Sequence, residues 1–237
     1  MKKVLIHSLF LVGLLLSCGP QNVPYVDPSK QTEGIPGTFS GATVDQQYWQ
    51  YMMESELFFF RKNVTLVTSI ENTNLTIKCD NGKIEETDGR DYTAFYNVIG
   101  DLSDKGKLTL EHYYKESQYD PTTQTMTYFG DYKKMILEVF PEELVDIGLP
   151  PIISYNYVHF DEVSKSYKAT NAKGQYRYDY GGEGEVEVRT YDIYNVDVKF
   201  NEGLLVYVRF EHNQQGDAYS LDCSAYGATS VTLPVVN

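Results

Sequence analysis

Three tyrosines at alternate positions form the pattern in this chain that is best suited to bind a ligand. Tyr176, Tyr178 and Tyr180 alternate with Arg177 and Asp179, so in a β-strand all three rings lie on one face. A tyrosine ring stacks on a sugar or an apolar ligand and also offers a hydroxyl group. We predict a ligand-binding face here. A half-exposed structural strand is the alternative, because tyrosine is favoured in such strands.

Catalytic chemistry has few candidates in the sequence. Hydrolysis by serine needs an exposed nucleophile with a base nearby, and the Gly-x-Ser-x-Gly motif that presents such a serine is absent. His112, His159 and His212 occur without the close spacing of metal ligands. The 33 acidic residues single out no pair for glycoside hydrolysis. We expect no catalytic residue, metal or cofactor, and a carboxylate-dependent hydrolase is an alternative.

The first 18 residues are typical of an export signal. Lys2 and Lys3 precede a short apolar segment that ends in Leu15-Leu16-Ser17-Cys18, and the apolar segment is too short to span a bilayer. The ending resembles the bacterial lipobox, which implies cleavage before Cys18 and lipidation of its sulfur and its new amino terminus. An ordinary cysteine behind a generic signal peptide is the alternative.

Cleavage at Cys18 would leave a strongly acidic chain on a tether. The loss of Lys2 and Lys3 leaves 18 basic against 33 acidic residues, a formal charge of −15, which argues against nucleic-acid binding. Residues 18–36 contain four prolines and would hold the domain away from the membrane. Gly19 replaces the acidic residue of inner-membrane retention signals, which favours the outer membrane over the inner membrane. The partner is therefore a membrane, reached through the lipid anchor.

The two remaining cysteines leave two alternatives open. An exported chain can keep a disulfide between Cys79 and Cys223. Both also lie in alternating strand patterns among apolar neighbours, so two buried free thiols are equally compatible with the sequence.

The periodicity of apolar residues predicts one helix followed by many strands. Residues 44–60 have helical spacing, and Thr43 with Gln46 fits a capping box. We expect Trp49 to pack in the core. Asn81-Gly82 and Asn201-Glu202-Gly203 predict β-hairpins. About ten to twelve short strands in the remaining chain indicate an antiparallel barrel or sandwich in a single domain over 37–237.

Three short stretches resemble a known protein family. They are residues 37–41 (Gly-Thr-Phe-Ser-Gly), residues 140–144 (Phe-Pro-Glu-Glu-Leu) and residues 195–210. They look like the lipid-anchored, calycin-like β-barrel proteins of gut and oral Bacteroidetes, and the resemblance implies a barrel. The amphipathic helix before the first long strand departs from that pattern and leaves a cystatin-like α+β fold as the alternative.

The sequence therefore predicts a lipoprotein of the bacterial cell envelope, in the periplasm or at the outer surface. Its expected role is non-catalytic binding of a small molecule, a glycan or a partner protein. A structural or assembly component of the envelope is the first alternative, and the hydrolase is the second.

Overall fold

The computed structural model describes residues 32–54, 62–70, 73–87, 93–99, 108–139, 150–179, 186–212 and 218–236. The lipobox, most of the predicted tether and the Phe140–Leu144 turn lie outside the described residues. So does the second part of the predicted helix, from residue 55. Among the described residues, no helix is long and apolar enough to cross a membrane.

The described part of the chain is mainly β, with one α-helix and antiparallel sheets. The helix is α1 (Gln46–Glu54), and a short 3-10 helix, η4, spans Tyr155–Tyr157. The strands in chain order are β1 (Phe39–Ser40), β2 (Thr43–Val44), β3 (Asn63–Ile70), β4 (Thr73–Asp80), β5 (Lys83–Thr87), β6 (Thr93–Val98), β7 (Leu108–Asp120), β8 (Thr125–Val139), β9 (Ile152–Ile153), β10 (His159–Asp161), β11 (Ser166–Asp179), β12 (Val186–Asn201), β13 (Leu204–Glu211) and β14 (Ala218–Ser224).

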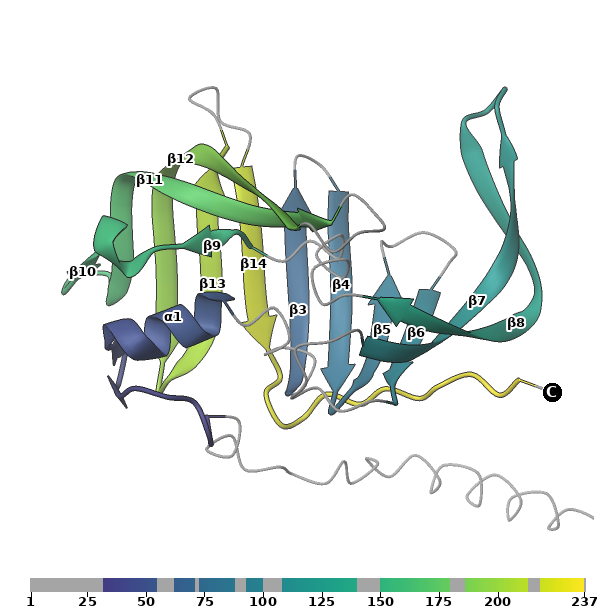
Figure 1. Ribbon diagram of the computed structural model, residues 1–237, viewed down its shortest axis with the longest axis horizontal. Coiled ribbons are helices and arrows are strands. Elements are labelled where there is room, and N and C mark those ends of the chain that lie inside the picture. Colours follow the sequence, from purple (N-terminus) through teal and green to yellow (C-terminus); the bar gives the residue numbers. More distant parts are fainter. Residues whose placement is uncertain are drawn as a thin grey trace, which may run out of the picture.

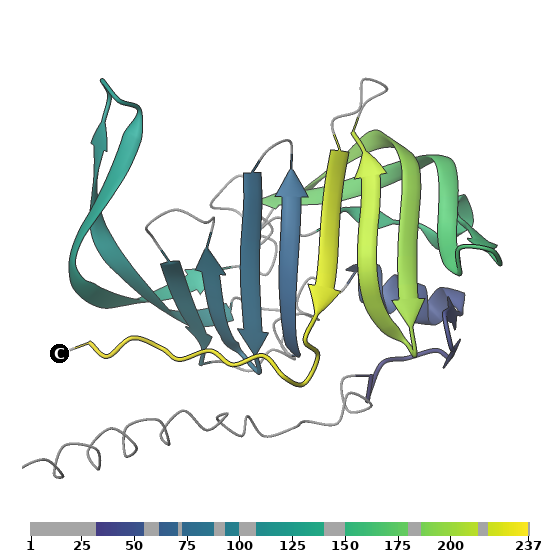
Figure 2. The ribbon, with the colours of Figure 1, turned by 180° about the vertical axis from the view of Figure 1, so that it is seen from behind.

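Twelve strands form one large antiparallel sheet in the order β10-β11-β12-β13-β14-β3-β4-β5-β6-β7-β8, with β9 added beside β11. Figure 1 shows that β11, β12 and α1 lie over the same face of the central strands, and Figure 2 confirms this from behind. The sheet does not close into a barrel. Of the two predicted arrangements, barrel or sandwich, the closed barrel is therefore not the one observed, and the sheet is compatible with a sandwich.

Two predicted hairpins are present with the expected turns. Asn81 and Gly82 both have positive φ angles between β4 and β5, as the type I′ geometry requires. Glu202 and Gly203 have positive φ angles between β12 and β13. Strands β11 and β12 are longer than the sequence pattern indicates. In β12, a register shift against β13 between Tyr194 and Asp197 interrupts the pairing without ending the strand.

Helix α1 begins at a different cap from the one predicted. The Oδ1 atom of Asp45 accepts a hydrogen bond of 2.8 Å from the Tyr48 amide, and its Oδ2 atom accepts two of 2.7 Å from the Thr38 amide and hydroxyl. Thr43 instead donates its hydroxyl to the Ser40 carbonyl. Gly37 permits this approach, since a Cβ there would lie 2.4 Å from the Tyr48 nitrogen.

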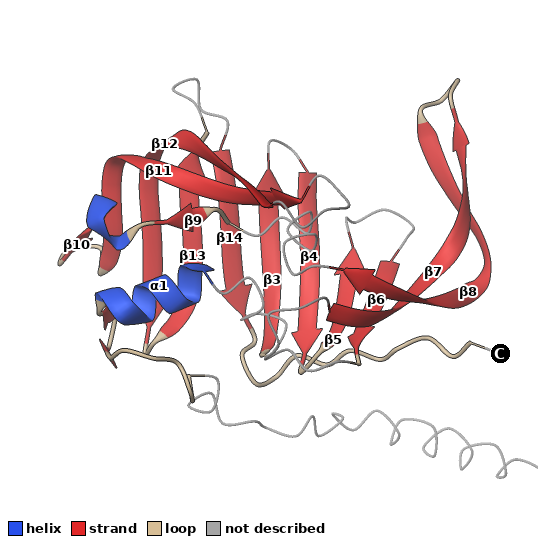
Figure 3. Ribbon diagram, in the orientation of Figure 1, coloured by secondary structure: helices blue, strands red, loops and turns tan. Residues whose placement is uncertain are grey.

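Helix α1 lies across one face of the sheet (Figure 3), and the side chains that it buries there are large. Tyr48, Trp49, Met52 and Met53 are all buried, so the aromatic residues of the helix belong to the core. They pack with Tyr167 and Phe200, whose rings lie 5.1 Å and 5.8 Å from the Trp49 ring. Ile35, inside the predicted tether, also packs against this core.

The segment after β14 is fastened to the start of β3 by a buried asparagine. The Nδ2 atom of Asn63 donates to the Thr229 carbonyl at 2.6 Å, and its Oδ1 atom accepts from the Thr229 amide at 2.7 Å. Asn63 also donates to Asp80 at 2.8 Å. The side chain therefore pairs with Thr229 as a strand backbone would, and residues 225–236 follow the lower end of the sheet (Figure 2).

Replacement of Asp45 by alanine tests the observed cap. We expect D45A to lower the free energy of unfolding by about 1 kcal/mol at pH 7, the usual cost of a lost N-cap, and T43A to lower it much less. Hydrogen bonds from Tyr48 and Thr38 lower the pKa of Asp45. The stabilisation is therefore complete well above the unfolded pKa, and the difference between wild type and D45A should narrow as the pH falls below about 4. Urea unfolding at several pH values measures this; equal losses for the two variants would contradict it.

Candidate functional site

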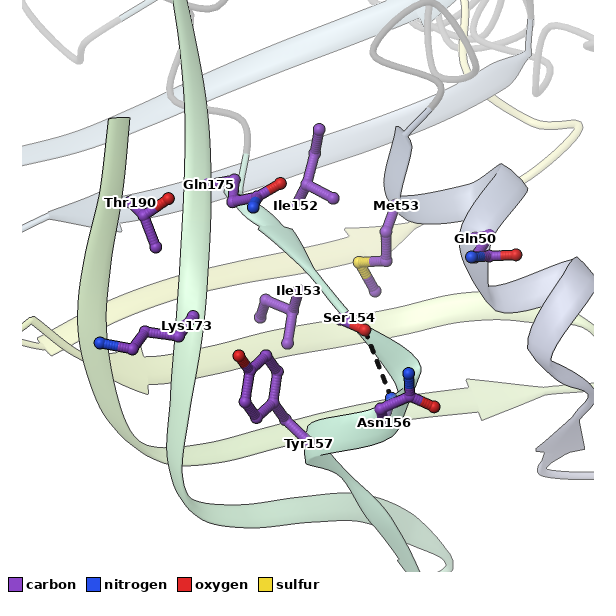
Figure 4. A pocket seen from close by; sticks show the side chains of 10 residues that line it. All are labelled: Gln50, Met53, Ile152, Ile153, Ser154, Asn156, Tyr157, Lys173, Gln175 and Thr190. Carbon is purple, nitrogen blue, oxygen red and sulfur yellow. Dashed lines mark hydrogen bonds between the residues drawn. The ribbon is translucent and has the colours of Figure 1, made fainter. Parts of the chain in front are cut away.

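A cavity lies between the helix and the overhanging part of the sheet. It has a volume of about 520 Å³, within the range of small-molecule sites. Figure 4 shows α1 on one side, β11 and β12 on the other, and β9 with η4 between them. Its lining residues are Gln50, Met53, Ile152, Ile153, Ser154, Asn156, Tyr157, Lys173, Gln175 and Thr190.

Strand β9 and η4 are held in place by hydrogen bonds to neighbouring elements. The indole Nε1 of Trp49 donates to the Ile153 carbonyl at 2.6 Å, and β9 pairs with β11 at Gly174 and Gln175. A Cβ on Gly174 would lie 3.0 Å from the Pro151 ring, so the glycine permits a close approach of the chain before β9. Directly after β9, the Ser154 hydroxyl caps η4 by accepting a hydrogen bond of 3.4 Å from the Asn156 amide.

The cavity combines an apolar floor with a neutral polar rim. Ile153 is fully buried and Met53 nearly so, and their side chains lie in the centre of the site in Figure 4. Around them stand the amide side chains of Gln50, Asn156 and Gln175. Amides both donate and accept hydrogen bonds, so the rim can bind hydroxyl groups in either orientation.

Tyr157 adds an accessible aromatic ring to this rim. Its side chain is 45% exposed, and Figure 4 shows it extending from η4 toward Lys173. A ring with one open face can stack on the apolar face of a sugar or another flat ligand.

The charge in the cavity is nearly balanced. Lys173 is the one charged residue among the described lining residues, and its Nζ atom forms an ion pair with Asp192. This ion pair raises the pKa of Lys173. None of the described lining residues is an aspartate, glutamate, histidine or cysteine. The cavity therefore suits an uncharged polar ligand, and its described lining supplies no carboxylate pair for hydrolysis.

A second recess, of about 770 Å³, lies between β8 and the C-terminal segment. Lys115, Lys133 and Lys134 line it. Lys133 and Lys134 form ion pairs with Glu116 and Glu111, and Lys115 lies 5.0 Å from the centre of the Tyr132 ring. Because these cations already have partners inside the chain, the recess is a weaker candidate than the cavity beside α1.

The tyrosine ladder continues β11 from Gln175, a residue that lines the cavity. Tyr176 follows Gln175 on β11, and Tyr176 and Tyr178 pair with Arg189 and Glu187 of β12. The side chains of Tyr176 and Tyr178, and all of Tyr180, lie outside the described residues. The ligand-binding role of this ladder stays a prediction.

The two cysteines are free and buried in this structure. Cys223 on β14 lies opposite Leu66 of β3, and Cys79 on β4 lies opposite Val64 of the same strand. With β3 between them, the Cα atoms are at least two strand spacings apart, about 9.5 Å, which is farther than a disulfide spans. Burial raises the pKa of Cys79 to about 12 and also raises that of Cys223, so both thiols are protonated at neutral pH.

The histidines are dispersed in the structure. His112 stacks on Tyr96 at 4.8 Å on the β6–β7 side of the sheet, and burial lowers its pKa. His159 is exposed on β10, and His212 contacts Phe210 at 5.0 Å. Among the described residues, no three side chains of the metal-ligating types gather into a site.

Comparison with known proteins gives no further guide to this cavity. The sequence matches no protein-family model, and no curated protein emerges as a relative. The geometry and chemistry of the site are therefore the guide to its function.

Replacement of Trp49 by phenylalanine tests the bond that fixes the cavity floor. W49F leaves the Ile153 carbonyl buried without its donor, which we expect to lower the free energy of unfolding by about 1–3 kcal/mol. Y155F is the matched control, because it removes a hydroxyl from an aromatic residue that also contacts Trp49, and the bond from this hydroxyl to the Val44 carbonyl is long, at 3.4 Å. Denaturant unfolding followed by circular dichroism compares the two. A loss for W49F no larger than for Y155F would show that the indole bond does not hold β9.

Proposed function

We propose that this protein is a non-catalytic binding module of the bacterial cell envelope, and that the cavity beside α1 binds an uncharged, hydroxyl-rich ligand such as a glycan. The observation that carries the proposal is the cavity itself: amide side chains around the apolar floor of Met53 and Ile153, with the exposed ring of Tyr157 at the rim. Sugars have hydroxyl groups at their edges and apolar faces, so this combination complements them.

The absence of an acidic residue from the described lining supports binding over hydrolysis. A glycoside hydrolase needs two carboxylates about 5–10 Å apart across its cleft. The described lining of the cavity has amide and hydroxyl side chains but no carboxylate. The hydrolase alternative therefore has no support at this site.

We also propose that the fold is calycin-like, and the order of the strands supports this. Strands β3 to β8 follow one another across the sheet, and β14 pairs back onto β3. This is the order of an up-and-down barrel opened between β8 and β10. The helix across the sheet is the feature shared with the cystatin-like alternative, which lacks this long circular order of strands.

The proposed location rests on the sequence of the leader. Cleavage before Cys18 and acylation of that residue would anchor the protein, with about 0.8 kcal/mol for each methylene buried in the membrane. Residues 18–36 would then set how far the cavity can lie from the membrane, and Gly19 supports the outer membrane as the destination.

Mass spectrometry of the protein from bacterial membranes tests the anchor. We expect the mature chain to begin at Cys18 and to carry acyl groups on it, and we expect C18S to leave the membrane fraction. S17T is the matched control, because it changes the same motif and retains the cysteine. An unmodified Cys18, or an amino terminus elsewhere, would reject the lipoprotein assignment.

Substitutions at the rim test the ligand class. On a glycan array, we expect the wild-type protein to bind uncharged oligosaccharides. Y157A should weaken binding to the best of them about tenfold, from the loss of ring contact, and Q175A should also weaken it. Y119A is the control, since Tyr119 is equally accessible on the distant β7–β8 hairpin. Calorimetric titration measures the change.

The array results distinguish the cavity from the tyrosine ladder as the binding site. Equal weakening by Y157A and Y119A would reject the cavity as the site. Y178A serves as a separate probe of the tyrosine ladder: loss of binding in Y178A with retention in Y157A would move the site from the cavity to β11.

A further inference from the structure

Strand β8 forms one edge of the large sheet, and no described strand pairs with its outer side. It is long, from Thr125 to Val139, and with β7 it extends beyond the rest of the sheet (Figures 1 and 2). A free edge presents a row of unpaired backbone donors and acceptors that can pair with another strand. Proteins that remain monomeric protect such edges by charge, proline or short length.

The inner half of β8 is protected neither by proline nor by short length, and its charged residues are of both signs. Residues 133–139 read Lys-Lys-Met-Ile-Leu-Glu-Val, without proline. Met135 and Ile136 are 43% and 54% exposed, and because they are adjacent in a strand they lie on opposite faces. The edge is therefore apolar on both faces of the sheet.

The charges of this segment are arranged so that it complements itself. In an antiparallel pair of two identical strands centred on Ile136, Lys134 of each strand faces Glu138 of the other, and Met135 faces Leu137. Directly opposed residues in such a pair have Cβ atoms about 5 Å apart. The Nζ atom of Lys134 is already positioned by its 2.8 Å bond to Glu111. We propose that the inner half of β8 pairs with the same segment of a second copy of this chain and forms a symmetric dimer.

A bend in β8 sets the extent of this pairing. Gly130 has a φ angle of 76°, and the register with β7 shifts between Tyr114 and Glu116. The straight part of the edge therefore begins after the bend, and it contains the self-complementary segment. Two continuous sheets would join there across the two-fold axis.

In an antiparallel dimer, the projecting half of each β7–β8 hairpin extends past the end of the partner's β8. Beyond the bend, Tyr119 and Met126 lie opposite each other and are 54% and 44% exposed. A two-stranded ribbon of this kind is marginally stable alone. In the dimer, the hairpin of each copy continues past Val139 of the other.

Charge exchange at the two-fold axis tests the dimer. The full chain in mild detergent should sediment as a dimer. E138K places lysine opposite lysine twice, while the bond between Lys134 and Glu111 is retained, and we expect it to raise the dimer dissociation constant about tenfold. The double variant K134E/E138K restores opposite charges across the axis and should recover most of the affinity. E162K is the control for net charge, at the opposite edge of the sheet.

Cross-linking tests the register independently. I136C places two thiols on the axis, within disulfide distance in a strand pair, so mild oxidation should give a covalent dimer. V188C, at an equally exposed position on β12, should give no more covalent dimer than the wild-type protein. A monomeric wild-type protein, a dimer unchanged in E138K, or equal cross-linking by the two cysteine variants would each overturn the proposal. Circular dichroism checks that every variant is folded.

Discussion

The attachment of helix α1 to the curved sheet is the interaction on which the rest of this structure depends. Three buried polar groups make it. The Tyr48 hydroxyl donates to the Gly203 carbonyl at 2.6 Å, the Trp49 indole donates to the Ile153 carbonyl at 2.6 Å, and the Tyr167 hydroxyl bonds both backbone groups of Val44. A buried carbonyl without its donor is costly, so these bonds select one placement of the helix where apolar contact alone would allow several. That placement creates the cavity, because β9 and η4 lie between the helix and β11.

Local features of the sequence predicted local features of the fold. Asn81-Gly82 predicted a hairpin because the turn requires positive φ angles that these residues adopt readily. The cap of α1 was predicted at Thr43 but lies at Asp45, since a left-handed Gly37 brings Thr38 onto the same carboxylate. Nothing in the sequence spacing indicates that second contact. The open edge between β8 and β10 was not predictable either, because strand alternation is the same in a sheet that closes and in one that does not.

The cavity was harder still to predict. Its residues come from α1, β9, η4, β11 and β12, and the bond that fixes them joins Trp49 to Ile153, 104 residues apart. Gln50 and Gln175 look like ordinary solvent-facing residues of a helix and a strand when each is considered alone. Only the fold brings them to one rim. The tyrosine ladder can be recognised in the sequence because its spacing is regular, whereas a binding rim assembled from distant segments has no regular spacing.

The pairing of β14 with β3 constrains when the chain can fold relative to its synthesis. The central strand β3 pairs with β14, which is synthesised almost last. The hydrogen bond from Asn63 at the start of β3 to Thr229 joins residues 166 positions apart. A chain that crosses a membrane from its amino terminus therefore cannot complete its core until nearly all of it has emerged. Until then, β3 has one open edge, and long-range pairing of this kind is slow. An incomplete chain would leave that edge exposed. If the proposed export route holds, chaperones that shield unpaired strands would have to protect the protein until β14 has emerged.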